Sequence, residues 1–135
     1  VHSLPDAEDD DYNISFKMVK DLVDANVTVA LGNSGEYWQS RNIPFYAGQT
    51  TAHGLSFEDA LQLITKNPAT ILGVSDKLGT LEAGKDATLI VSKGNALEMN
   101  GNTISHAFIN GRSISLESHQ TELYKRYMEK YERAK

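Results

Sequence analysis

The sequence contains no cysteine among its 135 residues, only three prolines and one tryptophan, and no apolar run long enough to cross a bilayer. Without cysteine the chain can form neither a disulfide framework nor a thiolate metal site, and its redox compartment stays open. Acidic residues outnumber basic ones by 18 to 13, and the net charge of −5 argues against a sequence-independent nucleic-acid binder. We therefore expect a soluble protein of the cytoplasm or the periplasm, without nucleic-acid or membrane partners.

The chain also lacks an initiating methionine, because it begins at Val1. The following residues show neither the basic n-region nor the apolar h-region of a secretory signal. The length suits one small domain, and the composition, 40% hydrophobic and 23% charged, is ordinary for a globular protein. We interpret the sequence as a processed protein or an excised part of a longer one.

Residues 57–91 form the stretch around which the rest of the sequence is organised, and they begin with helix signals. Ser56 stands at an N-cap position, and Asp59 follows three residues later, as in a capping box. Apolar residues recur at helical spacing behind this cap. The pattern predicts a helix that starts at Phe57 and buries one face.

Asn67 and Pro68 interrupt that helix. Proline disfavours the helical conformation for the residue before it, so the first helix is predicted to end at Asn67. Asn67 can then cap a second, short helix whose first residue is Pro68. Gly73 can close this helix in the left-handed conformation. A turn at residues 82–85 and a short strand at residues 87–91 complete the prediction.

The segments before this stretch alternate between helix and strand. Residues 15–25 carry apolar side chains on one face of a predicted helix, which Asn26 can close. Residues 27–31 are apolar on both faces and partly β-branched, which is typical of a strand in a covered parallel sheet. A polar loop at residues 36–42 and a helix from Pro44 to Gly54 follow.

After the central stretch, the sequence predicts a hairpin and a final helix. Asn110 and Gly111 separate two strand-like runs, and this dipeptide is a strong hairpin signal because both residues tolerate positive φ. Ser118 begins the last helix, in which apolar side chains recur at i, i+3, i+4 and i+7. We interpret this stripe as a packing face; it comprises Tyr124, Tyr127, Met128 and Tyr131.

The central stretch resembles the C-terminal signature of the amidohydrolase superfamily, an ALxxxTxNPA core followed by LGxxDxxGxLExGKDADLxV. The matching residues are Ala60, Leu61, Thr65, Asn67, Pro68, Ala69, Leu72, Gly73, Asp76, Gly79, Leu81, Glu82, Gly84, Lys85, Asp86, Ala87, Leu89 and Val91. Thr88 stands where the family usually has a second Asp. The chain is most similar to the imidazolonepropionase-like and cyclic-imide-type metal hydrolases.

The resemblance implies an α/β fold, the tail of a (β/α)8 barrel with its last strand and helices, then a few strands of the flanking β-sandwich and a C-terminal helix. Residues 1–75 would form the end of the barrel, with residues 27–31 as its eighth strand. Residues 76–117 would supply the composite sandwich strands, and residues 118–135 the helix. A complete barrel needs roughly 200 residues or more. We therefore interpret the chain as the C-terminal fragment of a larger protein.

The candidate site follows residue 31, because barrel enzymes place catalytic residues at the C-terminal ends of strands. The resemblance implies an Asp there that binds the metal and takes a proton from the attacking water, which needs a carboxylate base. Ser34 occupies that position, beside Asn33, so we assign no catalytic residue. Three interpretations stay open. The site is degenerate, which we favour; or Glu36 or an upstream residue supplies the base; or Asn33 and Ser34 only hydrogen-bond a substrate.

Asn33, Ser34, Glu36 and His2 are the predicted substrate-binding residues. On the family's layout His2 would follow the seventh strand, near the mouth of the site, although we favour the interpretation that it is an ordinary loop histidine. The family's metal ligands, a His-x-His pair, a Lys or Glu bridge and two single histidines, belong to earlier strands that this chain lacks. We expect no metal in this chain, while the parent protein can hold a divalent ion such as zinc. The four histidines show no i, i+4 or His-x-His spacing.

Two hypotheses of function follow. In the first, the chain is the C-terminal fragment of an amidohydrolase-like enzyme that hydrolyses non-peptide carbon–nitrogen bonds, as in cyclic amides, and it has no turnover of its own. In the second, the parent keeps the fold but binds a small molecule or a partner without catalysis. The expected partners are the remainder of the parent chain and a small-molecule substrate. If the chain stands alone, exposed apolar faces would favour a homo-oligomer.

Overall fold

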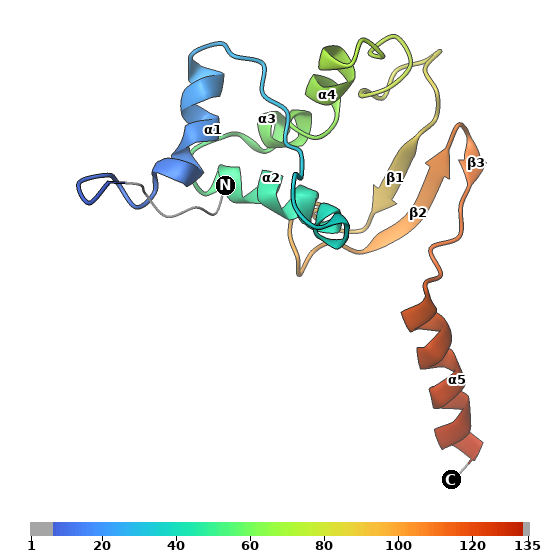
Figure 1. Ribbon diagram of the computed structural model, residues 1–135. Helices are drawn as coiled ribbons and strands as arrows, with labels where there is room; N and C mark the ends of the chain where they lie inside the picture. The colour runs from blue at the N-terminus through green and yellow to red at the C-terminus, as the bar shows by residue number, and fades with distance from the viewer. Residues whose placement is uncertain (1–6, 134–135) are drawn as a thin grey trace.

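Among residues 7–133, the part of the chain that the structure describes, four short α-helices lie beside a small antiparallel sheet and a fifth helix extends away from both (Figure 1). The structure is a computed structural model. Its elements are α1 (Ile14–Asp24), the 3-10 helix η1 (Tyr37–Asn42), α2 (Ile43–Thr51), α3 (Phe57–Gln62), α4 (Lys66–Ile71), β1 (Leu89–Ser92), β2 (Ile104–Ile109), β3 (Arg112–Ser113) and α5 (His119–Arg133). The fold is therefore mixed α/β.

The hydrophobic core lies between the first helices and takes one residue from the sheet region. Val19 of α1, Ala47 of α2 and Ala60 of α3 are almost completely buried, together with Leu63 just after α3. Leu97 enters the same core from the loop that joins β1 to β2. The core is thus built by short helices and completed by a side chain from a distant loop.

A glycine lets this loop approach α2. A Cβ on Gly48 would lie 2.2 Å from the carbonyl oxygen of Leu97, a separation that no side chain tolerates. The loop is folded on itself, since Asn95 accepts a hydrogen bond from the Leu97 N–H through its side-chain oxygen at 2.9 Å. Gly48 and Leu97 therefore form the contact through which the sheet region is attached to the helices.

α1 lies within one residue of its predicted bounds and α3 begins where it was predicted to, although α3 ends earlier, at Gln62. α1 ends at Asp24, and Asn26 adopts a φ of 59° just beyond it. Ser56 is the N-cap of α3, where its Oγ accepts a hydrogen bond from the Asp59 N–H at 3.1 Å. The same hydroxyl donates to the Asp59 carboxylate at 2.6 Å. Local signals thus decided where α3 starts and where α1 stops.

The prediction for Asn67 and Pro68 is wrong. α3 ends at Gln62 and α4 begins at Lys66, so both residues lie in the first turn of α4. Proline is accommodated there because the N–H groups of a first helical turn have no partner within the helix. Asn67 does not cap the helix, and its side-chain amide donates to the carbonyl oxygen of Val29 at 2.8 Å instead.

Gly73 closes α4 as the sequence predicts. Its φ is 70°, and its N–H donates to the carbonyl oxygen of Thr70 at 3.1 Å. The N–H of Val74 reaches back to the carbonyl oxygen of Ala69 at 2.9 Å. These two bonds form a Schellman motif, which satisfies carbonyl groups that the end of a helix leaves unpaired.

The sheet is an antiparallel meander with β2 between β1 and β3. The predicted turn between β2 and β3 is confirmed, because Asn110 and Gly111 have φ angles of 50° and 76°. β3 is shorter than predicted, since only Arg112 and Ser113 pair with β2. The loop from Gly73 to β1 contains the predicted turn at residues 82–85, where the Lys85 N–H donates to the Glu82 carbonyl oxygen.

Residues 27–31 do not form a strand, contrary to the prediction. A strand requires a neighbour that supplies donors and acceptors along its edge, and no segment among residues 7–133 forms a ladder with residues 27–31. The segment runs without a turn or bend from the end of α1 towards η1. Its Leu31 N–H donates to the carbonyl oxygen of Leu63 at 3.0 Å. Apolar, β-branched composition alone was therefore not sufficient for a strand.

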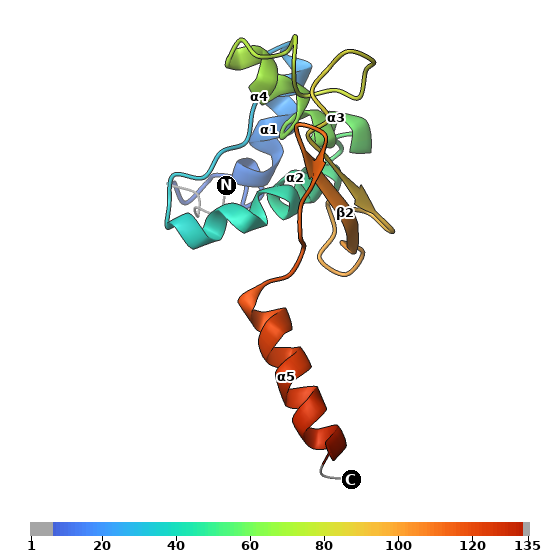
Figure 2. The same ribbon diagram turned by 90° about the vertical axis from the view of Figure 1, so that its right-hand side faces the viewer.

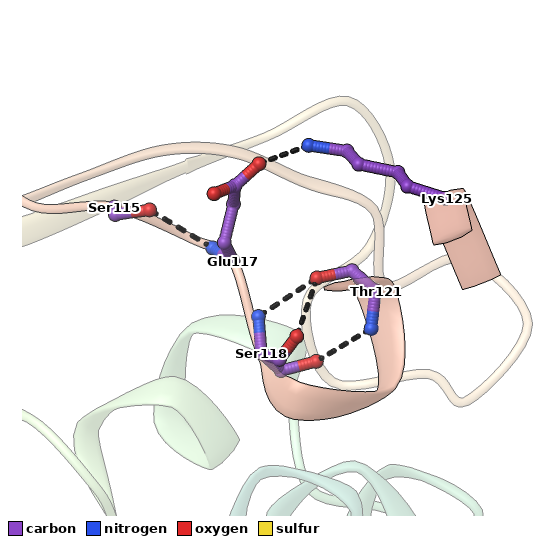
Figure 3. A network of polar contacts seen from close by, with 5 residues as sticks. All are labelled: Ser115, Glu117, Ser118, Thr121 and Lys125. Atoms are coloured by element: carbon purple, nitrogen blue, oxygen red, sulfur yellow. Dashed lines mark hydrogen bonds and ion pairs between the residues drawn. The ribbon is translucent and has the colours of Figure 1, made fainter. Parts of the chain in front are cut away.

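A reciprocal cap starts α5, as Figure 3 shows. The Ser118 Oγ accepts from the Thr121 N–H at 3.3 Å, and the Thr121 Oγ1 accepts from the Ser118 N–H at 2.8 Å. This arrangement is a capping box with threonine in the place of the usual glutamate. Glu117 forms an ion pair with Lys125 beside it. The predicted start of the last helix is confirmed.

The predicted packing of the α5 stripe is not found among residues 7–133. Figures 1 and 2 show α5 pointing away from the helices and the sheet in both views. No residue of α5 is buried, and the stripe is 41–66% exposed at Tyr124, Tyr127, Met128 and Tyr131. In this part of the chain no helix is both long and apolar enough to span a membrane.

Candidate functional site

The loop of residues 32–36, which we call the site loop, is shaped by the side chain of Asn33. The Asn33 Nδ2 donates to the carbonyl oxygen of Glu36 at 3.1 Å. The Asn33 Oδ1 accepts from the Gly35 N–H at 3.2 Å. Both polar atoms of the amide are therefore used within the loop, in the manner of an Asx turn. Asn33 organises the loop, and its role in substrate binding stays a prediction.

Ser34 and Glu36, the other two predicted binding residues in the site loop, are exposed. Glu36 is the residue that precedes η1, with backbone angles of −57° and 136°. Ser34 at the family's carboxylate position leaves Glu36 as the only acidic side chain of the loop. The fourth predicted residue, His2, lies outside the described residues. Substrate binding by these residues stays a prediction.

The polar loop predicted at residues 36–42 is largely a 3-10 helix that presents aromatic side chains. Tyr37 is 92% exposed and Trp38 is 56% exposed. The guanidinium carbon of Arg41 lies 5.8 Å from the centre of the Trp38 ring, within cation–π range. The sequence signal for this contact is the three-residue spacing between Trp38 and Arg41, because a 3-10 helix aligns residues i and i+3. An aromatic and cationic surface thus borders the site loop.

A separate hollow of about 290 Å³ lies between α2 and the loop that joins β1 to β2. Its walls include Phe45, Gln49, Phe57, Asn95 and Met99. Of the predicted substrate-binding residues, the three that the structure describes, Asn33, Ser34 and Glu36, do not contribute to it. No pattern in the sequence predicts a hollow there, because the hollow depends on how Leu97 docks against Gly48.

The described residues do not fit a divalent metal ion. Within residues 7–133, no three His, Cys, Asp or Glu side chains gather closely enough to hold one. His53 stacks on Phe16 with ring centres 5.3 Å apart, and His106 stacks near Phe108 in β2. These histidines have packing roles in different parts of the fold.

The sequence from residue 10 to residue 114 matches the model of the amidohydrolase family. This range includes the site loop, the signature stretch and the sheet, and it stops before α5.

Two curated relatives show how large a part of a protein this chain represents. N-acetylglucosamine-6-phosphate deacetylase of Caenorhabditis elegans is 38% identical over 65 residues, which are 48% of this chain and 14% of that protein. Imidazolonepropionase of Porphyromonas gingivalis is 30% identical over 79 residues, 56% of this chain and 19% of that protein. The chain spans less than a fifth of the length of these relatives.

Solved structures agree with the sequence comparison. An amidohydrolase from Thermotoga maritima has a TM-score of 0.68 and 29% sequence identity, over 74% of this chain and 26% of that one. A second amidohydrolase structure shares the fold with a TM-score of 0.62 at 24% identity, over 78% of this chain and 27% of that one. Family match, relatives and fold agree, and the chain belongs to the amidohydrolase family.

Proposed function

We propose that this chain is the C-terminal part of an amidohydrolase that hydrolyses non-peptide carbon–nitrogen bonds in small molecules, with cyclic amides as the leading substrate class. The observation that carries the proposal is the family match over residues 10–114. Its relatives include a deacetylase named for an N-acetylated sugar phosphate and an imidazolonepropionase. Both names denote chemistry at a carbon–nitrogen bond.

In the parent protein, this chain would complete the fold and would contact the substrate through the site loop. Residues 1–75 would complete the end of a barrel, residues 76–117 would add strands to a sandwich, and residues 118–135 would form the terminal helix. The exposed apolar residues of the described chain support this assignment, since Leu72, Leu81 and Ile90 are 56–83% exposed. Apolar side chains exposed to this degree fit a surface that another part of the protein covers. The remainder of the parent protein is the proposed cover, with self-association as the alternative.

Turnover is assigned to groups outside this chain. Hydrolysis of an amide needs a base that can take a proton from water. Asn33 and Ser34 cannot act as carboxylate bases, and the described residues do not fit a metal. The proposed contribution of the site loop is to contact the substrate at the mouth of the site. A divalent ion such as zinc would belong to the remainder of the parent.

A second candidate function rests on the same loop. If Ser34 marks a degenerate site, the parent uses the amidohydrolase fold to bind a small molecule or a partner without catalysis. The neutral Ser34 at the family's carboxylate position supports this alternative, and the neighbouring Asn33 amide is also uncharged and is bonded within the loop. The alternative differs from the first proposal in one respect, the absence of turnover.

The first test is the intact mass of the natural gene product in its source cell. A product several times longer than 135 residues supports the proposal, and a product of this length overturns it. The natural product is then assayed with a cyclic imide and with an N-acetylated amino sugar phosphate, with and without added zinc. Turnover supports the first function, and saturable binding without turnover supports the second. In the same assays the 135-residue chain should show no turnover.

A further inference from the structure

Residues 27–31 carry backbone groups that a neighbouring strand would normally satisfy, although no strand pairs with them among residues 7–133. Backbone N–H and C=O groups that are shielded from water almost always find partners. Two groups in this segment have long-range partners. The carbonyl oxygen of Val29 accepts from Asn67 at 2.8 Å, and the N–H of Leu31 donates to Leu63 at 3.0 Å.

The positions of these two groups reveal a pattern. Val29 and Leu31 are two residues apart, and in an extended chain such residues direct their N–H and C=O groups along the same edge. In a parallel pair, a neighbouring strand would offer one donor to the first carbonyl and one acceptor to the second N–H. The Asn67 amide and the Leu63 carbonyl group offer that same combination. The junction between α3 and α4 therefore stands in for a strand.

The junction is well suited to this task because it is fixed in the core. Leu63 is 0% exposed, and as the C-cap residue of α3 it has a carbonyl group outside the helical ladder. Asn67 lies in the first turn of α4, and the Pro68 ring restricts the backbone directly after it. The Thr65 hydroxyl donates to the Leu61 carbonyl oxygen at 2.7 Å and bridges the break.

The site loop depends on this anchor. It begins one residue after Leu31, and the hydrogen bonds of Asn33 stay within the loop itself. Those bonds give the loop its shape but do not place it relative to the core. Its placement at this end comes from the bonds at Val29 and Leu31, together with the packing of these two side chains against the core.

We propose that Asn67 is a positioning residue for the site loop, acting through Val29 as a side-chain substitute for a strand neighbour. The opposite edge of the segment, with the backbone groups of Thr28 and Ala30, is then the edge left for pairing with a strand from elsewhere. The proposal concerns the placement of the loop and holds whether or not the parent turns over a substrate. It also gives the asparagine of the signature a contact beyond its own helix.

The test uses isotope-labelled 135-residue chain and three variants at one position. Asn67→Asp keeps the size of the side chain and removes the N–H donor, Asn67→Ala removes the whole amide, and Asn67→Gln keeps a donor. Thr70→Ala is the matched control, because the Thr70 hydroxyl bonds only to the Lys66 carbonyl oxygen of its own helix. The readouts are the carbonyl carbon shift of Val29, the amide shifts of Asn33 and Gly35, and the fluorescence of Trp38, the only tryptophan.

The expected result is that Asn67→Asp and Asn67→Ala shift the Val29 carbonyl signal, the site-loop amides and the Trp38 emission. Asn67→Gln should restore part of these signals, and Thr70→Ala should leave them unchanged. A merely structural Asn67 would lower the unfolding midpoint and shift the Val29 carbonyl signal alone, with the site-loop amides and the Trp38 emission unchanged, and that result overturns the proposal.

A measurement on the unaltered chain keeps the proposal falsifiable if the variants do not fold. The Leu31 amide should exchange with solvent at least about tenfold more slowly than the Ser34 amide, because the bond to Leu63 must open first. Equal exchange at Leu31 and Ser34 would show that the anchor does not hold, and the proposal would fail.

Discussion

α1 and α5 are both amphipathic helices, yet only α1 has a buried apolar side chain. α1, α2 and α3 place Val19, Ala47 and Ala60 in a common core, and Leu97 completes it. α5 carries a well-formed apolar stripe with no covering element among residues 7–133. An amphipathic pattern therefore determines which face of a helix can be buried. Whether that face is buried depends on a second element that packs against it.

The largest effect of a substitution on stability is expected at Leu63, which is completely buried. Leu63→Ala should lower the free energy of unfolding by about 2–5 kcal/mol, because it removes transferred apolar atoms and leaves a cavity. Tyr127→Ala in α5, where the ring is 52% exposed, should cost about 0.5 kcal/mol or less. Urea unfolding of both variants measures the contrast. Similar losses would mean that α5 is covered by something in solution.

A smaller effect is expected at Gly48, where the loop between β1 and β2 meets α2. Gly48→Ala places a Cβ 2.2 Å from the Leu97 carbonyl oxygen and should cost about 1–3 kcal/mol through overpacking. Alanine would otherwise favour the helix by about 1 kcal/mol, so a loss can be attributed to the contact. Gly32→Ala is the control, because a Cβ there meets no atom within 4 Å. Unchanged or increased thermal stability of Gly48→Ala would show that Leu97 does not dock there.

The smallest effect is a pH dependence confined to the start of α5. A hydrogen bond from Lys125, aided by its positive charge, lowers the pKa of Glu117 below its ordinary value of 4.5. A lowered pKa means that the stabilisation is present above the ordinary value and is lost as pH falls through the lowered value. The Thr121 amide should report fraying of the first turn on acidification, while Leu63 does not respond. Glu117→Gln should abolish this dependence, and a dependence that survives it would refute the assignment.

The sequence predicted those parts of the fold that are determined by neighbouring residues. Ser56 caps α3, Gly73 closes α4, and Asn110 with Gly111 turns the hairpin, because each acts through bonds within a few positions. The family resemblance was equally accessible, since it lies in an ordered run of residues. It is confirmed by the match over residues 10–114.

The sequence did not predict features that depend on distant parts of the chain. Residues 27–31 have strand composition but no strand neighbour, and Asn67 has capping chemistry but donates to a carbonyl group 38 positions away. In the site loop, the position of Ser34 was predictable from the resemblance. The hydrogen bonds of Asn33 within the loop and the contact between Trp38 and Arg41 were not predictable, because they depend on the local backbone path.

The entry of Leu97 into the helical core has a consequence for synthesis on the ribosome. Translation proceeds from the N-terminus, so α1, α2 and α3 emerge before the residue that completes their packing. Until Leu97 emerges, the surface around Gly48 has no cover, and a nascent chain stalled in this interval exposes an unfinished core. Such chains are the species on which chaperones and aggregation act. Between the emergence of Leu63 and that of Leu97, this core is therefore incomplete.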